Sequence, residues 1–80
     1  NVEYAGVFGS RARGDNKLDS DLDLLIKFKD GNVIGFFELI ALEKKLSVLL
    51  GLKVDLVTQD SLSPYFREPI LRDLKIVYRS

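Results

Sequence analysis

The sequence contains no cysteine and no histidine among its 80 residues. Without cysteine, the chain can form neither a disulfide framework nor a thiolate metal site. Without histidine, it has no imidazole that could ligate a metal or act as a general base. A metal site in this chain would need oxygen ligands, which favours Mg²⁺ or Mn²⁺ over Zn²⁺.

Long hydrophobic runs and an excess of charge are also missing. No apolar run approaches the roughly 20 residues of a membrane-spanning helix, and no signal-peptide pattern appears, so we expect a cytoplasmic protein without a membrane partner. Lysine plus arginine and aspartate plus glutamate number 12 each, which gives a formal net charge of zero. Binding to duplex nucleic acid needs a strongly basic face, so we expect none here.

The residues that are present describe one globular domain. Hydrophobic residues make up 46% of the chain and charged residues 30%, and a chain of this length has room for a single core. We therefore treat residues 1–80 as one domain. An apolar strand follows Asn1 almost at once, so we expect the domain to begin upstream of this residue. A core of this size is marginal, so a partner chain or a homodimer would suit it.

The hydrophobic pattern predicts strands, because β-branched and aromatic residues gather in short segments. The predicted strands cover residues 2–8, 21–28 and 52–58, with a short last strand over 76–78. A turn cluster at residues 29–32 follows the second of them. Helices are expected between these strands, so the order predicts an α/β (α+β) fold, a small mixed β-sheet with flanking helices.

The longest helix is expected from Phe36 to Leu50, because its apolar residues recur at helical spacing and Gly51 can end it. A shorter helical turn is expected over 11–13, with Ser10 as its N-cap. Near the end of the chain, Ser63-Pro64 predicts another helix start. Pro69 is expected to divide that region into two short helical pieces.

The predicted strand over 21–28 carries two carboxylates on one face. Asp21 and Asp23 are two residues apart, so on a strand their side chains would point the same way, with Cα atoms about 6–7 Å apart. Carboxylates this close repel one another, and divalent cations between them would remove the conflict. The alternative is a solvent-exposed strand face, which accommodates aspartates without any ligand.

A third carboxylate, Asp55, lies within Val54-Asp55-Leu56-Val57. Aspartate is unfavourable in strands, so it needs a hydrogen bond, a cation or a metal there. If this strand pairs with the strand over 21–28, the three carboxylates can converge on one site. The alternative is an ion pair between Asp55 and a lysine or arginine.

Gly9-Ser10 follows the first predicted strand. Glycine permits a tight turn and the close approach of a ligand. Ser10 and the amides after it would suit a phosphate, and Arg11 and Arg13 would add positive charge. The alternative is a plain strand-to-helix turn with surface arginines. A phosphate-binding turn beside metal-binding carboxylates is the equipment of phosphoryl or nucleotidyl transfer.

These motifs resemble the signature of the nucleotidyltransferase superfamily that includes DNA polymerase β. Gly9-Ser10 is followed, after ten residues, by Asp21-Leu22-Asp23. The segments F-G-S-R-A-R-G and S-D-L-D-L-L-I are most similar to the minimal nucleotidyltransferase branch, and V-D-L-V around Asp55 supplies the third carboxylate. The resemblance covers nearly the whole chain.

The resemblance implies a role for each of these residues. Gly9 and Ser10, with Arg11 and Arg13 beside them, would bind the phosphates of ATP. Asp21, Asp23 and Asp55 would be catalytic and would hold two Mg²⁺ or Mn²⁺ ions. The acceptor of AMP would be a hydroxyl group, a tyrosine of a HEPN-domain ribonuclease toxin in part of the family, so that the chain acts as an antitoxin.

We expect two differences from the family: the helix that usually precedes the first strand is not seen in this sequence, and 80 residues leave no room for the second domain that larger members carry. Acceptor binding would then fall to a partner or a dimer mate, with Tyr65, Phe66 and the edge over 52–57 as candidate contacts. Two alternatives to the active enzyme are a non-catalytic antitoxin that neutralises its partner by occlusion and a fragment of a larger transferase.

Overall fold

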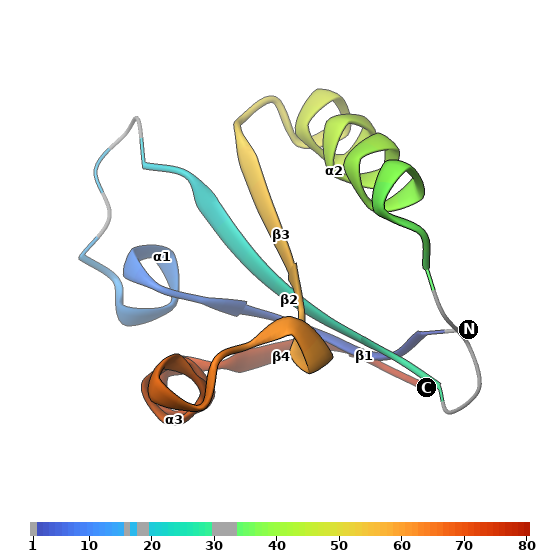
Figure 1. Ribbon diagram of the computed structural model, residues 1–80. Helices are drawn as coiled ribbons and strands as arrows, with labels where there is room; N and C mark the ends of the chain where they lie inside the picture. Colours follow the sequence, from blue (N-terminus) through green and yellow to red (C-terminus); the bar gives the residue numbers. More distant parts are fainter. Residues whose placement is uncertain (1, 16, 18–19, 30–33) are drawn as a thin grey trace.

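The computed structural model (Figure 1) describes residues 2–15, 17, 20–29 and 34–80. Strands β1 (Val2–Phe8), β2 (Leu22–Phe28), β3 (Val54–Thr58) and β4 (Lys75–Arg79) form one sheet in the order β3-β2-β1-β4. Strand β1 runs antiparallel to β2 and β4, whereas β2 and β3 are parallel. The sheet is therefore mixed, as the sequence predicts. Most of the predicted turn at 29–32 lies outside the described residues.

The helices are α1 (Ser10–Arg13), α2 (Phe36–Leu50) and α3 (Pro64–Asp73), with a short 3₁₀ helix, η1 (Gln59–Ser61), after β3. The prediction for α2 is confirmed at both ends. Gly51 ends this helix in the left-handed conformation with φ +69°, a backbone angle that suits glycine. Strands β2 and β3 begin one or two residues later than predicted, which is an ordinary discrepancy at element ends.

The prediction that Pro69 divides the last helical region is wrong, because α3 runs through it as one helix. Proline lacks the N–H that would bond to the carbonyl of Tyr65 one turn earlier. Tyr65 is exposed, so water can reach that carbonyl and the cost of the lost bond is small. Pro64 occupies the start of the helix, and the Ser63 side chain accepts a hydrogen bond from the Tyr65 N–H, as an N-cap should.

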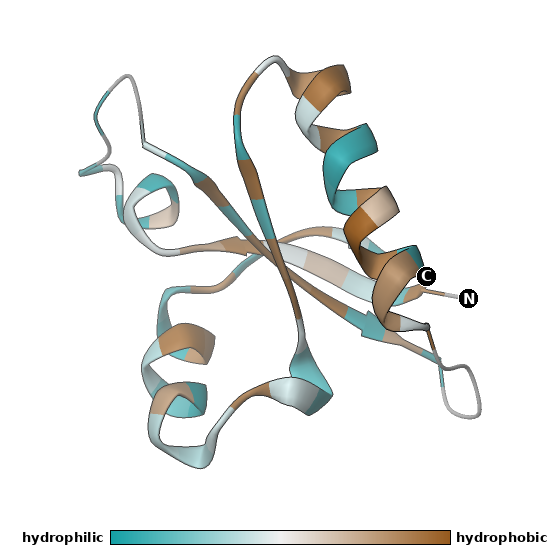
Figure 2. Cartoon of the chain, turned by 45° about the horizontal axis from the view of Figure 1, so that its top comes forward, coloured by the Kyte–Doolittle hydropathy of each residue, from teal (hydrophilic) through white to brown (hydrophobic). Residues whose placement is uncertain are grey.

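One face of the sheet packs against α2. Its core consists of alternate residues of β2 and β3, namely Leu24, Ile26, Val54 and Leu56. Leu39, Leu42 and Leu46 of α2 pack on that core because they recur at helical spacing on one side of the helix. The same alternation is visible as hydrophobic and hydrophilic bands along β3 in Figure 2.

Helix α2 also closes the outer edge of β3. The Val54 N–H donates to Ser47 Oγ at 3.0 Å, and the Leu56 N–H donates to Glu43 Oε2 at 2.8 Å. These two side chains take the place of a further strand, so the edge offers few free backbone donors to another chain. The edge over 52–57 is therefore a poor contact for an acceptor protein.

The opposite face of the sheet carries α1 and α3 (Figure 1). Leu25 is fully buried there, and Ala12 of α1 is nearly so. Leu74, just after α3, lies so close to Gly6 of β1 that a Cβ on Gly6 would be 2.6 Å from its Cδ1. Because side chains alternate along a strand, Asp23 and Asp55 share this face and not the face covered by α2.

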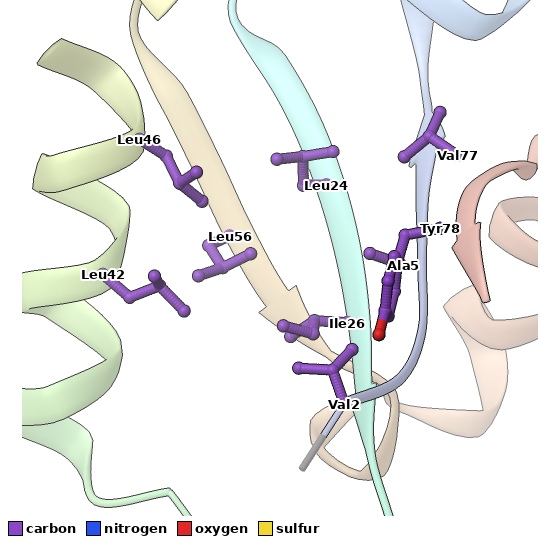
Figure 3. A pocket seen from close by; sticks show the side chains of 9 residues that line it. All are labelled: Val2, Ala5, Leu24, Ile26, Leu42, Leu46, Leu56, Val77 and Tyr78. Carbon is purple, nitrogen blue, oxygen red and sulfur yellow. The ribbon is translucent and has the colours of Figure 1, made fainter. Parts of the chain in front are cut away.

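An apolar groove of about 450 Å³ lies on the α2 face (Figure 3). The groove is lined by residues of α2 and of all four strands, including Leu42, Leu46, Leu24, Leu56, Val77 and Tyr78. None of the described residues that line it carries a carboxylate, so this lining does not offer the charged groups that phosphate chemistry requires. The candidate functional residues lie across the sheet from it. Among the described residues, no helix is long and apolar enough to cross a membrane.

Candidate active site

The centre of the site is a pair of carboxylates on neighbouring parallel strands. Asp23 of β2 is the register partner of Asp55 on β3, and on its other side it pairs with Phe8 of β1. The side chains of directly paired residues point to the same face. The predicted convergence of Asp23 and Asp55 is thus present in the sheet itself.

Asp55 lies at the surface, whereas Asp23 is half-buried. The alternative of an ion pair for Asp55 finds no support, because no salt bridge of Asp55 occurs within the part of the chain that the structure describes. Its position leaves the carboxylate open to solvent and to a ligand. Aspartate at this strand position gains nothing from packing, which is typical of a functional residue.

Asp21 stands apart from this pair. It is the residue immediately before β2, which begins one residue later than predicted, so Asp21 lies outside the paired part of the strand. Its Oδ2 lies 3.9 Å from Lys53 Nζ, and both side chains are well exposed. Over residues 2–15, 17, 20–29 and 34–80, no three histidine, cysteine, aspartate or glutamate side chains are gathered closely enough to hold a metal ion.

The donor chemistry of these residues nevertheless fits a hard cation, since carboxylate oxygens are the ligands that Mg²⁺ and Mn²⁺ prefer. Asp23 and Asp55 are already adjacent. Asp21 would become available to the same cation by leaving Lys53, and an exposed ion pair of this kind is worth about 0–1 kcal/mol.

Gly9 brings the turn after β1 against Asp23. Its backbone has φ +76° and ψ −154°, a combination that is almost confined to glycine. A Cβ placed on Gly9 would also collide with Oδ2 of Asp23. Gly9, and not Ser10 as the sequence predicted, is the N-cap of α1, and no side chain caps this helix. The structure therefore unites the two predicted halves of the site, the glycine turn and the carboxylates.

The first amides of a helix lack acceptors within the helix, and those of Ser10 and Arg11 follow directly on Gly9, which lies against Asp23. The turn itself is held by backbone bonds: the Arg13 N–H donates to the Gly9 carbonyl at 3.1 Å, and the Gly14 N–H donates to the Ser10 carbonyl at 2.9 Å. These two bonds hold the backbone of the turn, including the amides of Ser10 and Arg11, in place.

The two arginines predicted at the phosphates have partners of their own. Arg11 donates from Nε and Nη2 to the Ser20 carbonyl, at 3.2 and 2.8 Å. Arg13 bonds to Asp15 at 3.2 Å and to Asp73, the last residue of α3, at 2.9 Å. The Asp73 contact links α1 to α3. No local pattern in the sequence marks Asp73 or the Ser20 carbonyl: the first contact depends on where α3 lies over the sheet, and the second on the path of the chain between α1 and β2.

Burial raises the pKa of Asp23 above its ordinary value of 3.8, and the charges of Asp55 and Asp21 raise it further, while Arg13 opposes the shift. The charges of Asp55 and Asp21 therefore both act against ionisation of the Asp23 carboxylate. A cation bound there would relieve this repulsion. Perturbation by burial and by like charges is typical of functional carboxylates.

This shift predicts a pH dependence of stability. In the folded chain Asp23 binds its proton more tightly than in the unfolded chain, so its contribution to stability is complete below the ordinary aspartate value and is lost as pH rises through the raised pKa. In metal-free urea titrations, lowering the pH from about 7 to about 4 should raise the unfolding free energy of the wild type relative to Asp23→Asn. A difference that moves the other way would contradict the assignment.

The aromatic residues expected to contact an acceptor are accessible. Tyr65 is 89% exposed and Phe66 is 65% exposed on α3. Neither is a core residue: both are exposed, whereas Leu74, just after α3, packs against Gly6 of β1. Large exposed aromatic side chains are typical of interaction surfaces.

The chain matches the nucleotidyltransferase domain family over residues 2–77. Protein adenylyltransferase MntA of Thermococcus cleftensis is 42% identical over 76 residues, which span 95% of this chain and 75% of that protein. A solved structure described as a minimal nucleotidyltransferase is 40% identical, with a TM-score of 0.76 over 94% of this chain and 74% of its own.

Two more distant structures share the fold. A toxin–antitoxin structure with AMP-PNP has a TM-score of 0.87 at 23% identity, and this chain spans 62% of it. A tri-AMPylated HEPN toxin of Shewanella oneidensis in complex with an MNT antitoxin gives a TM-score of 0.76 at 20% identity, with 58% of that chain spanned. The family match covers the turn at Gly9 and all three carboxylates. By this match and by its close relatives, the chain belongs to the minimal nucleotidyltransferases, enzymes of the nucleotidyltransferase domain family.

Proposed function

We propose that this chain transfers AMP from ATP to a tyrosine hydroxyl of a HEPN-domain toxin and so acts as its antitoxin. The observation that carries the proposal is the register of Asp23 with Asp55 directly beside the Gly9 turn. The activity named for the MntA relative supports AMP transfer. The AMPylated toxin complex and the AMP-PNP structure, which share the fold, support the toxin as acceptor and ATP as donor.

In this proposal the Gly9 turn binds the donor. The free amides at Ser10 and the residue after it would take phosphate oxygens, and Arg13 adds positive charge at the same turn. Glycine is required because a side chain at this position would occupy the space between the turn and Asp23. The turn therefore orients the triphosphate so that its α-phosphate faces the carboxylates.

Asp21, Asp23 and Asp55 would hold two Mg²⁺ or Mn²⁺ ions, which when bound neutralise phosphate oxygens and activate the attacking hydroxyl. Asp55 lies at the surface, where an acceptor hydroxyl can reach it, and would accept the proton of that hydroxyl. The acceptor oxygen forms a bond to the α-phosphorus as the bond to the bridging oxygen breaks, and pyrophosphate leaves. We place this reaction in the cytoplasm, where ATP is available.

The test combines the chain with a HEPN-domain toxin, Mg²⁺ and ATP labelled at the α-phosphate. We expect label on the toxin and a parallel fall in its ribonuclease activity. Omission of ATP should leave the toxin active. If the toxin is neutralised without label, and neutralised equally by Asp21→Asn and Asp23→Asn, the chain acts by occlusion and the proposal is wrong.

A further inference from the structure

Arg11 makes the most specific side-chain contact between α1 and the start of β2. Its Nε and Nη2 both donate to the Ser20 carbonyl, at 3.2 and 2.8 Å, in a partly buried setting. The planar guanidinium can present two donors to one acceptor, which a lysine ammonium on its flexible stem cannot do with the same geometry. The contact fixes the backbone immediately before Asp21.

The hydroxyl, the N–H and the carbonyl of Ser20 all form hydrogen bonds. Its hydroxyl accepts from the Lys17 N–H at 2.8 Å, and its own N–H donates to the Lys17 carbonyl at 3.1 Å. On the other side of Asp21, the Leu22 N–H donates to the Lys53 carbonyl at 2.9 Å. Asp21 therefore sits between one residue anchored by α1 and another anchored beside β3.

The position of Asp21 depends on these anchors more than that of Asp23 does. Asp23 has register partners on both sides within the sheet. Asp21 lies outside the strand, its side chain is 44% exposed, and its contact with Lys53 at 3.9 Å is weak. Loss of the Arg11 contact should thus disturb Asp21 while leaving Asp23 in place.

We infer that Arg11 is a positioning residue, which ties the Gly9-Ser10 turn to Asp21 and sets where this carboxylate meets a divalent cation, and which does not itself bind phosphate. The same short helix begins at the turn and carries Arg11, so one element places the phosphate amides and, through Ser20, the first carboxylate. The inference rests on the proposed function, because it assigns Asp21 to the cation.

Binding of Mn²⁺ alone, followed by loss of the free-ion signal in electron paramagnetic resonance, tests this without catalysis. Arg11→Gln should weaken Mn²⁺ binding roughly tenfold, as loss of a residue that orients a ligand commonly does. Arg11→Lys should fall between this variant and the wild type. Arg72→Gln is the matched control, since Arg72 is 73% exposed and its one ion pair among the described residues is with Glu68 on its own helix. This variant should bind Mn²⁺ like the wild type.

Steady-state kinetics separate positioning from phosphate binding. For Arg11→Gln we expect a higher Mg²⁺ requirement for AMP transfer but a KM for ATP, at saturating Mg²⁺, within about twofold of wild type. In an Asp21→Asn background, Arg11→Gln should have little further effect on the rate, because both changes act on one carboxylate. Thermal melts confirm that each variant is folded.

Two results would overturn the inference. Unchanged Mn²⁺ binding with a raised KM for ATP in Arg11→Gln would assign the guanidinium to the phosphates. If Arg11→Gln lowers the rate of AMP transfer equally in the Asp21→Asn background and in the wild type, Arg11 does not act through Asp21. Failure of the proposed function gives a different result. A wild-type chain that binds no Mn²⁺ would contradict the proposed cation site itself, on which this inference rests.

Discussion

Replacement of Asp23 by asparagine should lower AMP transfer by roughly 1000-fold or more, the scale on which a catalytic site loses its main electrostatic group. Asp23 lies at the centre of the site. It is the register partner of Asp55 and lies against Gly9, and the charges of Asp21 and Arg13 act on its pKa. Transfer is measured as α-labelled AMP on the toxin. Asp21→Asn should also impair transfer, but less, because Asp21 lies further from the pair.

Asp23→Asn should not destabilise the metal-free chain. Burial and two like charges oppose ionisation of Asp23, so a neutral asparagine relieves repulsion, and the unfolding free energy at neutral pH should stay level or rise. Asp60→Asn, at the exposed 3₁₀ helix, is the control and should leave transfer intact. Clear destabilisation by Asp23→Asn in metal-free buffer would mean that Asp23 is a structural ion-pair residue.

Replacement of Gly9 by alanine should destabilise the chain by about 3 kcal/mol, since the backbone conformation there is nearly exclusive to glycine and the new Cβ meets a carboxylate. For a domain of this size, that is a large part of the total stability. Urea denaturation measures the effect. Transfer by the folded fraction should fall as well, because Asp23 has to move from its position.

Gly14 and Gly51 are matched controls for this substitution. Both also have positive φ, +82° and +69°, but no atom of the described part of the chain lies within 4 Å of a Cβ built on either. Each change to alanine should cost only about 1–2 kcal/mol, the ordinary penalty of the left-handed conformation. Asp23→Ala should recover part of the Gly9→Ala loss, because it removes the collision. If all three glycine variants lower the unfolding free energy by the same amount, the contact between Gly9 and Asp23 does not contribute to the loss.

The sequence was sufficient to predict the parts of the site that lie within single segments. Val2–Phe8 and Phe36–Leu50 follow from apolar periodicity alone, and these bounds are confirmed. The glycine turn and the carboxylates were predictable because aspartate in a strand and glycine after one are each locally unfavourable. The pairing of Asp23 with Asp55 needed only the assumption that their strands are neighbours.

Contacts between distant segments could not be predicted in this way. Arg11 and Arg13 are two residues apart in one short helix, yet one turns to the Ser20 carbonyl and the other to Asp73 across 60 positions of the chain. The direction of Arg13 depends on where α3 returns over the sheet, and that of Arg11 on the path of the chain between α1 and β2. The same limit applies to Pro69, which breaks a helix by local rules but is tolerated where the neighbouring carbonyl is exposed to water.

The central claim is that the Gly9 turn and the carboxylate pair form a nucleotidyl-transfer site, and the fate of each ATP phosphate tests it most directly. Parallel reactions with the toxin would use ATP labelled at either the α- or the γ-phosphate. We predict that the α-label appears on the toxin and that the γ-label appears only in pyrophosphate, with both signals lost in Asp23→Asn. Transfer of the γ-label to the toxin, or α-label transfer that persists in Asp23→Asn, would contradict the account.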